Sequence, residues 1–193
     1  MSVNIGVIPV SEPFKEYRAP AFDPESDAYL RINCEIVTDW LTAFIHDEVV
    51  RRRGYRKALV GLSGGVDSAV TAFLCARSLG PENVIGVRMP YRTSSPDSLS
   101  HALLAANKLG IECRTVDISP AVDGYLTGAP NADQRRRGNV MARMRMIVLF
   151  DLSAETAALP IGTGNKTERL FGYFTWHADD TPPVNPLGDL FKT

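Results

Sequence analysis

Ser63-Gly64-Gly65-Val66-Asp67-Ser68 joins a predicted strand to a predicted helix, and the other elements of the chain can be placed from this junction. The apolar segment 57–61 precedes it, and residues 69–77 follow it with apolar side chains at helical spacing. Two adjacent glycines let the backbone adopt dihedral angles that other residues avoid, so its N–H groups can approach a ligand. The first N–H groups of the helix are unpaired and carry partial positive charge. The junction therefore predicts an anion-binding loop.

The acidic residue of this loop indicates that the anion comes with a cation. Asp67 would repel a bare phosphate, so a bridging Mg²⁺ is expected beside it, with Ser63 and Ser68 as hydroxyl donors. No Gly-Lys-Ser or Gly-Lys-Thr follows, so the loop is not of the Walker type. The simpler alternative is a glycine turn in which Asp67 or Ser68 caps the helix.

Short apolar segments alternate with helical patterns on both sides of the junction. Strands are predicted at 57–61, 84–89, 112–118 and 158–161. Helices are predicted from residue 27 or 29 to 53, from the loop to Gly80, at 96–109 with Ser95 as the cap, and at 134–156. Residues 119–133 have the pattern of a loop with a short helical turn. This order predicts an α/β fold, in which a parallel sheet carries helices on both faces and the crossovers are right-handed.

Bulk composition narrows the class of protein. The 193 residues suit one domain at 28–193 and an extended, proline-rich arm at 1–27. A formal net charge of −1 gives no reason to expect nucleic acid or a membrane as a partner. No apolar run reaches the ~20 residues that a membrane span needs. Cys34, Cys75 and Cys113 are too scattered for a disulfide framework or a zinc ribbon, so a reducing cytoplasm is expected.

A second candidate segment, residues 162–168, follows the last predicted strand. Ligands of parallel sheets bind beyond the carboxyl ends of the strands, so Thr163 and its neighbouring glycines are expected to face the same ligand as the first loop. Glu168 would supply a second carboxylate to the metal beside Asp67. The alternative is structural: Asn165 caps a helix and Glu168 completes a capping box.

The predicted helix 134–156 is rich in arginine and has an apolar stripe formed by Val140, Met144, Ile147 and Val148. The arginines at 135–137 lie at its start, where cations oppose the helix dipole, so an anionic ligand or a partner's carboxylates are expected there. Arg143 and Arg145 are about 200° apart around the helix, so they flank opposite sides of the stripe and cannot easily share one phosphate. A solvated basic face is the alternative.

The junction resembles the pyrophosphate loop of the N-type ATP pyrophosphatases, a superfamily whose members split ATP between its α- and β-phosphates. Further segments are similar to the NAD synthetases in particular, and the similarity runs from about residue 33 to the last residue. These segments are 83–90, 138–146, 162–168, 170–175 and 185–193. The resemblance implies a Rossmann-like fold of the adenine nucleotide alpha hydrolase type.

The resemblance also implies roles for individual residues. ATP would be bound by Gly61, Leu62, Ser63, Gly64, Gly65, Val66, Asp67, Ser68, Arg88, Thr163 and Lys192. Asp67 and Glu168 would hold Mg²⁺, and together with Lys192 they would form the catalytic set. Arg143 and Asp179 would contact deamido-NAD. The chain departs from the family pattern at Trp176, Ala178 and Pro183, where many members carry Lys, Gly and Asp.

The implied reaction is an amide synthesis in two steps, catalysed by a homodimer. The nicotinate carboxylate of deamido-NAD attacks the α-phosphate of ATP, and ammonia then attacks the acyl adenylate to give NAD and AMP. About 55 residues precede the first strand, too few for the amidase domain of glutamine-dependent members, so ammonia is expected to be free or to come from a separate protein. The family normally continues beyond Thr193, so the chain is expected to lack a C-terminal segment.

Two other functions fit the junction taken alone. A tRNA-thiolating or lysidine-forming enzyme would need a cysteine near the loop or a basic surface, whereas Cys75 is expected to pack in the core. A nucleotide-binding subunit without catalysis is the second alternative. An assay of NAD formed from deamido-NAD, ATP and ammonium would separate the three.

Overall fold

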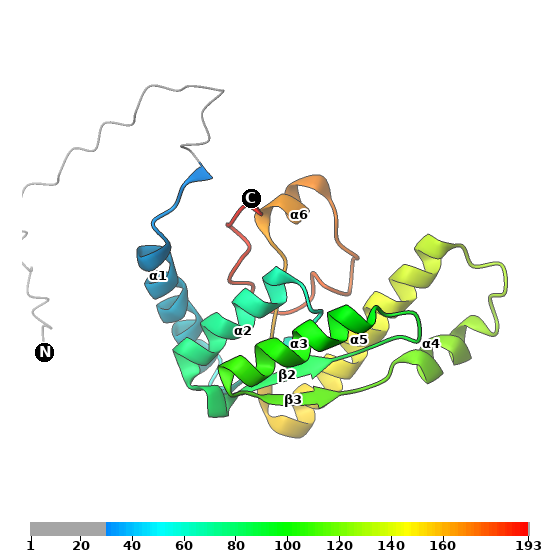
Figure 1. The fold of residues 1–193 in the computed structure, drawn as a ribbon, viewed down its shortest axis with the longest axis horizontal. Coiled ribbons are helices and arrows are strands. Elements are labelled where there is room, and N and C mark those ends of the chain that lie inside the picture. Colours follow the sequence, from blue (N-terminus) through cyan, green and yellow to red (C-terminus); the bar gives the residue numbers. More distant parts are fainter. Residues whose placement is uncertain (1–29, 193) are drawn as a thin grey trace, which may run out of the picture. The chain divides into compact units, whose positions relative to one another are not determined.

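The computed structural model describes residues 30–192 (Figure 1). The arm predicted at 1–27 lies outside the described residues. All of the helices and strands below belong to the unit Ile32–Thr193. Within the described part of the chain, no helix has the length and apolar character needed to cross a membrane.

One parallel sheet of four strands, in the order β3-β2-β1-β4, forms the centre of the fold. Its strands are β1 (Lys57–Gly61), β2 (Val84–Arg88), β3 (Glu112–Thr115) and β4 (Ala158–Ile161). β1 pairs with β2 on one side and with β4 on the other, so the loop that follows β1 begins at the middle of the sheet. Pro160 is accommodated because β4 is an edge strand, where a missing N–H leaves no neighbouring carbonyl unpaired.

Helices cover both faces of this sheet, as the sequence predicts. They are α1 (Cys34–His46), the π-helical η2 (Asp47–Arg52), α2 (Val66–Leu79), the 3₁₀ turn η3 (Pro81–Asn83), α3 (Pro96–Leu109), α4 (Ser119–Leu126), α5 (Gln134–Thr156) and α6 (Lys166–Phe171). Ala58 and Val60 of β1 pack in one apolar cluster with α1, α2 and α3, whereas Leu59 packs in a second cluster with α4 and α5. Alternate residues of the strand therefore bury against opposite layers. Figure 1 shows α2 and α3 side by side in the first layer.

Four sequence predictions about elements need correction. The first helix begins at Cys34, later than predicted, because the Asn33 side chain caps it by accepting a hydrogen bond from the Ile36 N–H at 3.1 Å. β3 ends at Thr115 instead of residue 118: the Val116 and Ile118 N–H groups still donate to the Arg88 and Pro90 carbonyls, but Pro90 has no N–H to donate in return. Residues 119–126 form the complete helix α4 instead of a single turn.

The apolar stripe predicted for α5 is the fourth correction. Val140, Met144 and Val148 are partly buried and pack against the second apolar cluster, as predicted, whereas Ile147 is 61% exposed. The fully buried residues of this helix are Leu149 and Leu152, so Leu149 takes the place in the stripe that was predicted for Ile147.

Gly86→Ala is expected to lower the free energy of unfolding by about 1–3 kcal/mol, because the interior is overpacked by the new methyl group. A Cβ at Gly86 of β2 would lie 2.5 Å from Leu62 Cδ1. Urea unfolding measures the change. Gly124→Ala in α4 is the matched control, because a Cβ there meets nothing within 4 Å. A neutral Gly86→Ala would show that Leu62 moves aside freely.

Candidate functional site

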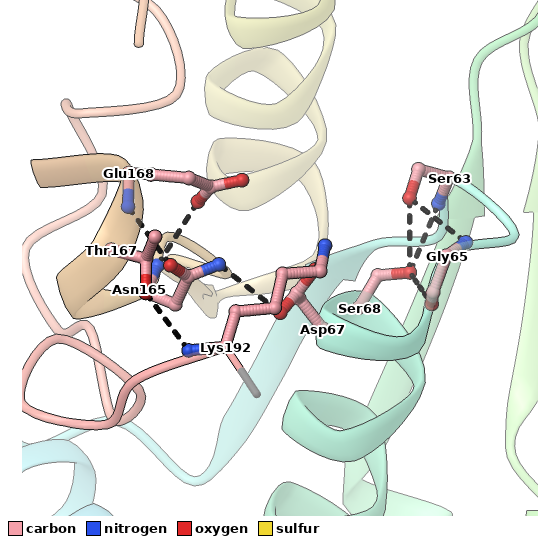
Figure 2. Close-up of polar contacts among 8 residues, drawn as sticks. All are labelled: Ser63, Gly65, Asp67, Ser68, Asn165, Thr167, Glu168 and Lys192. Carbon is pink, nitrogen blue, oxygen red and sulfur yellow. Dashed lines mark hydrogen bonds and ion pairs between the residues drawn. The ribbon is translucent and has the colours of Figure 1, made fainter. Parts of the chain in front are cut away.

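The loop after β1 is ordered by its own hydroxyl groups (Figure 2). Ser68 Oγ accepts a hydrogen bond from the Ser63 N–H at 3.3 Å and donates one to the Gly65 carbonyl at 2.9 Å, while Ser63 Oγ accepts from the Gly65 N–H at 3.2 Å. Gly64 has a φ of +84°, a conformation that favours glycine. The resulting turn directs the chain from the carboxyl end of β1 into α2.

The N-terminus of α2 carries no side-chain cap. Gly65 is the N-cap residue, and Asp67 and Ser68 lie within the first turn. The alternative in which Asp67 or Ser68 caps the helix is therefore wrong. The Asp67 carboxylate is left for contacts with other segments, and the first N–H groups of the helix donate to no capping side chain.

Asn165 joins the two predicted metal-binding acids (Figure 2). Its backbone N–H donates to Glu168 Oε2 at 3.1 Å and its Oδ1 accepts from the Glu168 N–H at 2.9 Å, which completes the predicted capping box of α6. Its Nδ2 also donates to Asp67 Oδ1 at 3.3 Å. Asn165 is only 2% exposed, so this amide is a fixed link between the start of α2 and the start of α6.

Lys192 places a positive charge on the same carboxylate. Its Nζ lies 2.6 Å from Asp67 Oδ2, and its backbone N–H donates to Thr167 Oγ1 at 3.0 Å. The hydrogen bond to Asp67 and the charge of that carboxylate raise the pKa of Lys192. Thus Asp67, Glu168 and Lys192, predicted from three distant segments, lie in one cluster.

Two carboxylates are a fitting but incomplete ligand set for a divalent cation. Among residues 30–192, no three His, Cys, Asp or Glu side chains gather closely enough to hold a metal. Mg²⁺ prefers hard oxygen ligands and usually takes one or two carboxylates, with water and substrate phosphates as the remainder. Asp67 and Glu168 match that pattern, and the ammonium group of Lys192 shows that a cation is favourable at Asp67.

Three cavities share the lining residue Asp179, and one of them is also lined by residues of this cluster. The first, of about 320 Å³, lies between the loop after β1, the segment after β4 and α5, and its lining includes Gly61, Leu62, Ser63, Gly162, Thr163 and Arg145. The second, of about 450 Å³, is lined in part by Asn165 and Glu168. The third, of about 660 Å³, is lined in part by Arg135, Arg143, Tyr173 and Trp176. Asp179 lines all three, and its Oδ1 accepts a hydrogen bond from the Thr175 N–H at 2.7 Å.

Arg143 and Arg145 point to different cavities, as their spacing predicts. Arg143 is exposed on the third cavity, and its Nε donates to the Trp176 carbonyl at 3.1 Å. Arg145 lines the first cavity, and its Nε donates to the Met89 carbonyl at 3.1 Å. Arg88 lines none of the three cavities among the described residues, and its Nε is buried there without a hydrogen-bond partner.

The sequence prediction of the site missed three polar residues. Asn165 was expected only to cap a helix, and Arg145 only to flank a stripe. Asn185 Oδ1 is buried without a partner among the described residues, beside Gly162 and Gly164. Arg145 carried one usable signal: it is a charged residue between Met144 and Met146 on a helix that covers the sheet.

Known proteins resemble this chain in sequence and in fold. The model of the family described as NAD synthase matches residues 37–193. The chain belongs to the NAD synthase family. Among its relatives, the NH3-dependent NAD+ synthetase of Chlorobium phaeobacteroides (strain BS1) is 51% identical over 164 residues, and that of Trichlorobacter lovleyi is 50% identical. Each match covers 85% of this chain and 59% or 60% of the relative, so the chain spans about three fifths of their length.

Two solved structures of similar proteins have the same fold. The NH3-dependent NAD synthetase of Campylobacter jejuni, solved with a nitrate ion, superposes with a TM-score of 0.80 at 36% identity, covering 84% of this chain and 70% of that one. The NMN synthetase of Francisella tularensis superposes with a TM-score of 0.78 at 29% identity, covering 84% and 67%. The Rossmann-like fold predicted from the sequence is therefore confirmed.

Proposed function

We propose that this member of the NAD synthase family uses ATP to join ammonia to deamido-NAD, with NAD, AMP and pyrophosphate as products. One observation carries the proposal: Asp67 and Glu168 converge on Asn165 beside a phosphate loop. The relatives that share about half of the matched residues are named for ammonia-dependent NAD synthesis. We further infer a homodimer and a cytoplasmic location, the latter supported by the free thiols of Cys34, Cys75 and Cys113.

The residues of the chain would align two anions and neutralise their charge. A nicotinate carboxylate oxygen attacks the α-phosphorus, and the bond from that phosphorus to the bridging oxygen breaks as pyrophosphate leaves. Ammonia then attacks the acyl carbon, the bond to the AMP oxygen breaks, and the nitrogen releases one proton. N–H groups of the loop, Ser63, Ser68, Thr163, Arg88 and Lys192 would hold the phosphates. Mg²⁺ held by Asp67 and Glu168 would offset the charge of the phosphate oxygens.

The deamido-NAD contacts would lie around the third cavity. Arg143 and Asp179 both line it, next to the aromatic side chains of Tyr173 and Trp176. A guanidinium beside aromatic rings is suited to a dinucleotide, whose phosphates and bases need a cation and a flat apolar surface. Asp179 also lines the first cavity, so the two substrates would meet near it.

Sulfur transfer is disfavoured by the state of the nearest cysteine. Cys75 of α2 is fully buried, and burial raises the pKa of its thiol to about 12. The thiolate, which is the reactive form, is then scarce at neutral pH. This weakens the tRNA-thiolation alternative.

The test of the proposed function is a set of parallel reactions with the 193-residue chain, ATP, Mg²⁺ and ammonium. With deamido-NAD we expect NAD and AMP in equal amounts. Nicotinate mononucleotide replaces deamido-NAD in a second reaction, because one structural neighbour is named NMN synthetase, and tRNA replaces it in a third. Turnover with only the mononucleotide or only tRNA would overturn the choice of acceptor, and ATP binding without turnover would support a non-catalytic nucleotide-binding protein.

Lys192→Met is expected to change two affinities in opposite directions. Without its ammonium group, Asp67 is free for Mg²⁺, so Mg²⁺ should bind the nucleotide-free protein up to about fivefold more tightly. ATP should bind about tenfold more weakly, because a cation that contacts phosphate is lost. Calorimetric titrations measure both, with Lys108→Met on the surface of α3 as the control. If both affinities are unchanged, the ion pair does not regulate the site.

A further inference from the structure

Arg145 has a half-buried guanidinium, and most of its N–H groups form no hydrogen bond within the described part of the chain. Its side chain extends from α5 to the first cavity. One hydrogen bond, from Nε to the Met89 carbonyl at 3.1 Å, holds the guanidinium in place. A guanidinium has five N–H groups, so four remain beyond this bond. Among the described residues, no carboxylate forms an ion pair with Arg145.

An unpaired cation in this position is costly for the ligand-free protein. Burial alone lowers the pKa of Arg145, with no carboxylate acting in the opposite direction. Buried charges are normally paired or bound to a ligand, because their hydration is lost. Arg114, whose side chain is also partly buried, follows that rule by pairing with Glu155 at 2.9 Å. Arg145 is therefore a candidate for binding an anion from outside the protein.

The cavity itself indicates which anion. Arg145 is the one cationic residue among its described lining residues, and Leu62, Met89 and Leu149 are among its apolar walls. Apolar walls suit an adenine ring, and Ser63 begins the phosphate loop at the same cavity. The α-phosphate joins adenosine to the pyrophosphate part of ATP, so it would lie at the boundary between the apolar walls and the loop.

We propose that Arg145 binds the α-phosphate of ATP and remains bound to the same phosphate group in the acyl adenylate and in AMP. The proposal rests on the proposed ATP site and names a residue within it. The loop and the N-terminus of α2 would hold the pyrophosphate part from one side, and Arg145 would hold the α-phosphate from α5 on the other. Since its Nε is already fixed to Met89, the guanidinium is pre-oriented and loses little freedom on binding.

The experiment compares ligands that differ only in phosphate. Affinities of adenosine, AMP and pyrophosphate are measured by calorimetry for the 193-residue chain and for Arg145→Gln. We expect AMP to bind about 10- to 100-fold more weakly to the variant, the range of a lost hydrogen bond to a charged group. Adenosine and pyrophosphate should each stay within about twofold. Arg77→Gln is the control and should alter none of the three, because Arg77 is exposed near the end of α2 and is not among the described residues that line the three cavities.

The alternative is that Arg145 only ties α5 to the end of β2. In that case adenosine and AMP would weaken equally, and the unfolding temperature would fall by more than about 8 °C, which would overturn the proposal. Weaker pyrophosphate binding with unchanged AMP binding would overturn it too. Arg145→Lys keeps the positive charge and should retain most of the preference for AMP over adenosine. This variant still tests the proposal if Arg145→Gln does not fold. If the unaltered chain shows no preference for AMP over adenosine, the ATP site itself is wrong.

Discussion

Asp67→Asn is expected to lower kcat/KM for ATP by about 100- to 1,000-fold, the scale of losing one charged group that stabilises the transition state. Asparagine has nearly the same shape and keeps an oxygen that can accept the hydrogen bond of Asn165 Nδ2. It removes the negative charge from one of two proposed Mg²⁺ ligands. We therefore expect the variant to fold normally and to need a higher Mg²⁺ concentration for half of its maximal rate.

The control for this variant is Asp97→Asn. Asp97 also lies in the first turn of a helix, α3, and it lines none of the three cavities within the described chain. Its loss should leave activity within about twofold. Steady-state rates at several Mg²⁺ concentrations separate the two variants. Near-normal activity of Asp67→Asn at low Mg²⁺ would rule out a metal at this carboxylate.

Gly64→Ala is expected to lose ATP binding and about 3 kcal/mol or more of stability. A Cβ at this position would lie 2.2 Å from the carbonyl oxygen of Ser98 and 2.8 Å from its Cα. Both atoms belong to the backbone of α3, so no side-chain rotation relieves the overlap. The φ of +84° adds the strain that an L-residue meets in this conformation.

Gly110→Ala separates the strain of the backbone conformation from the overlap. Gly110 has a φ of +68°, but a Cβ there meets nothing within 4 Å. We expect a loss of about 1–2 kcal/mol from conformation alone, with ATP affinity unchanged. Urea unfolding and ATP titration are measured for both variants. Equal stability losses, with ATP binding intact in Gly64→Ala, would show that the loop does not depend on its contact with α3.

The elements that the sequence predicts correctly carry strong local signals. β1 and β4 have the predicted ends, and α5 begins and ends at the predicted residues. Asp133 caps α5 by accepting a hydrogen bond from the Arg136 N–H at 2.7 Å, a pattern visible in sequence. α4 lacks such a cap and depends on burial of Val122 and Leu126, which the sequence alone does not reveal.

The sequence predicts the site residues whose positions follow from the ends of the strands. It does not predict the contacts that depend on which side chains are buried. Asp67 and Glu168 follow neighbouring parallel strands, so their approach follows from sheet topology. The link through Asn165 depends on which direction one amide faces, and the position of Arg145 depends on its contact with Met89, just after β2. The ATP contact expected of Arg88 stays a prediction. Its Nε is buried without a hydrogen-bond partner, and among the described residues Arg88 does not line any of the three cavities.

The most direct test follows an oxygen atom from the acceptor. Deamido-NAD carrying a heavy oxygen isotope in its nicotinate carboxylate is incubated with the chain, ATP, Mg²⁺ and ammonium. Attack of this carboxylate on the α-phosphorus, followed by cleavage of the acyl bond, leaves one labelled oxygen in AMP. We expect the label in AMP and unlabelled pyrophosphate. Label in pyrophosphate, or release of ADP and orthophosphate, would contradict cleavage of ATP between its α- and β-phosphates at this site.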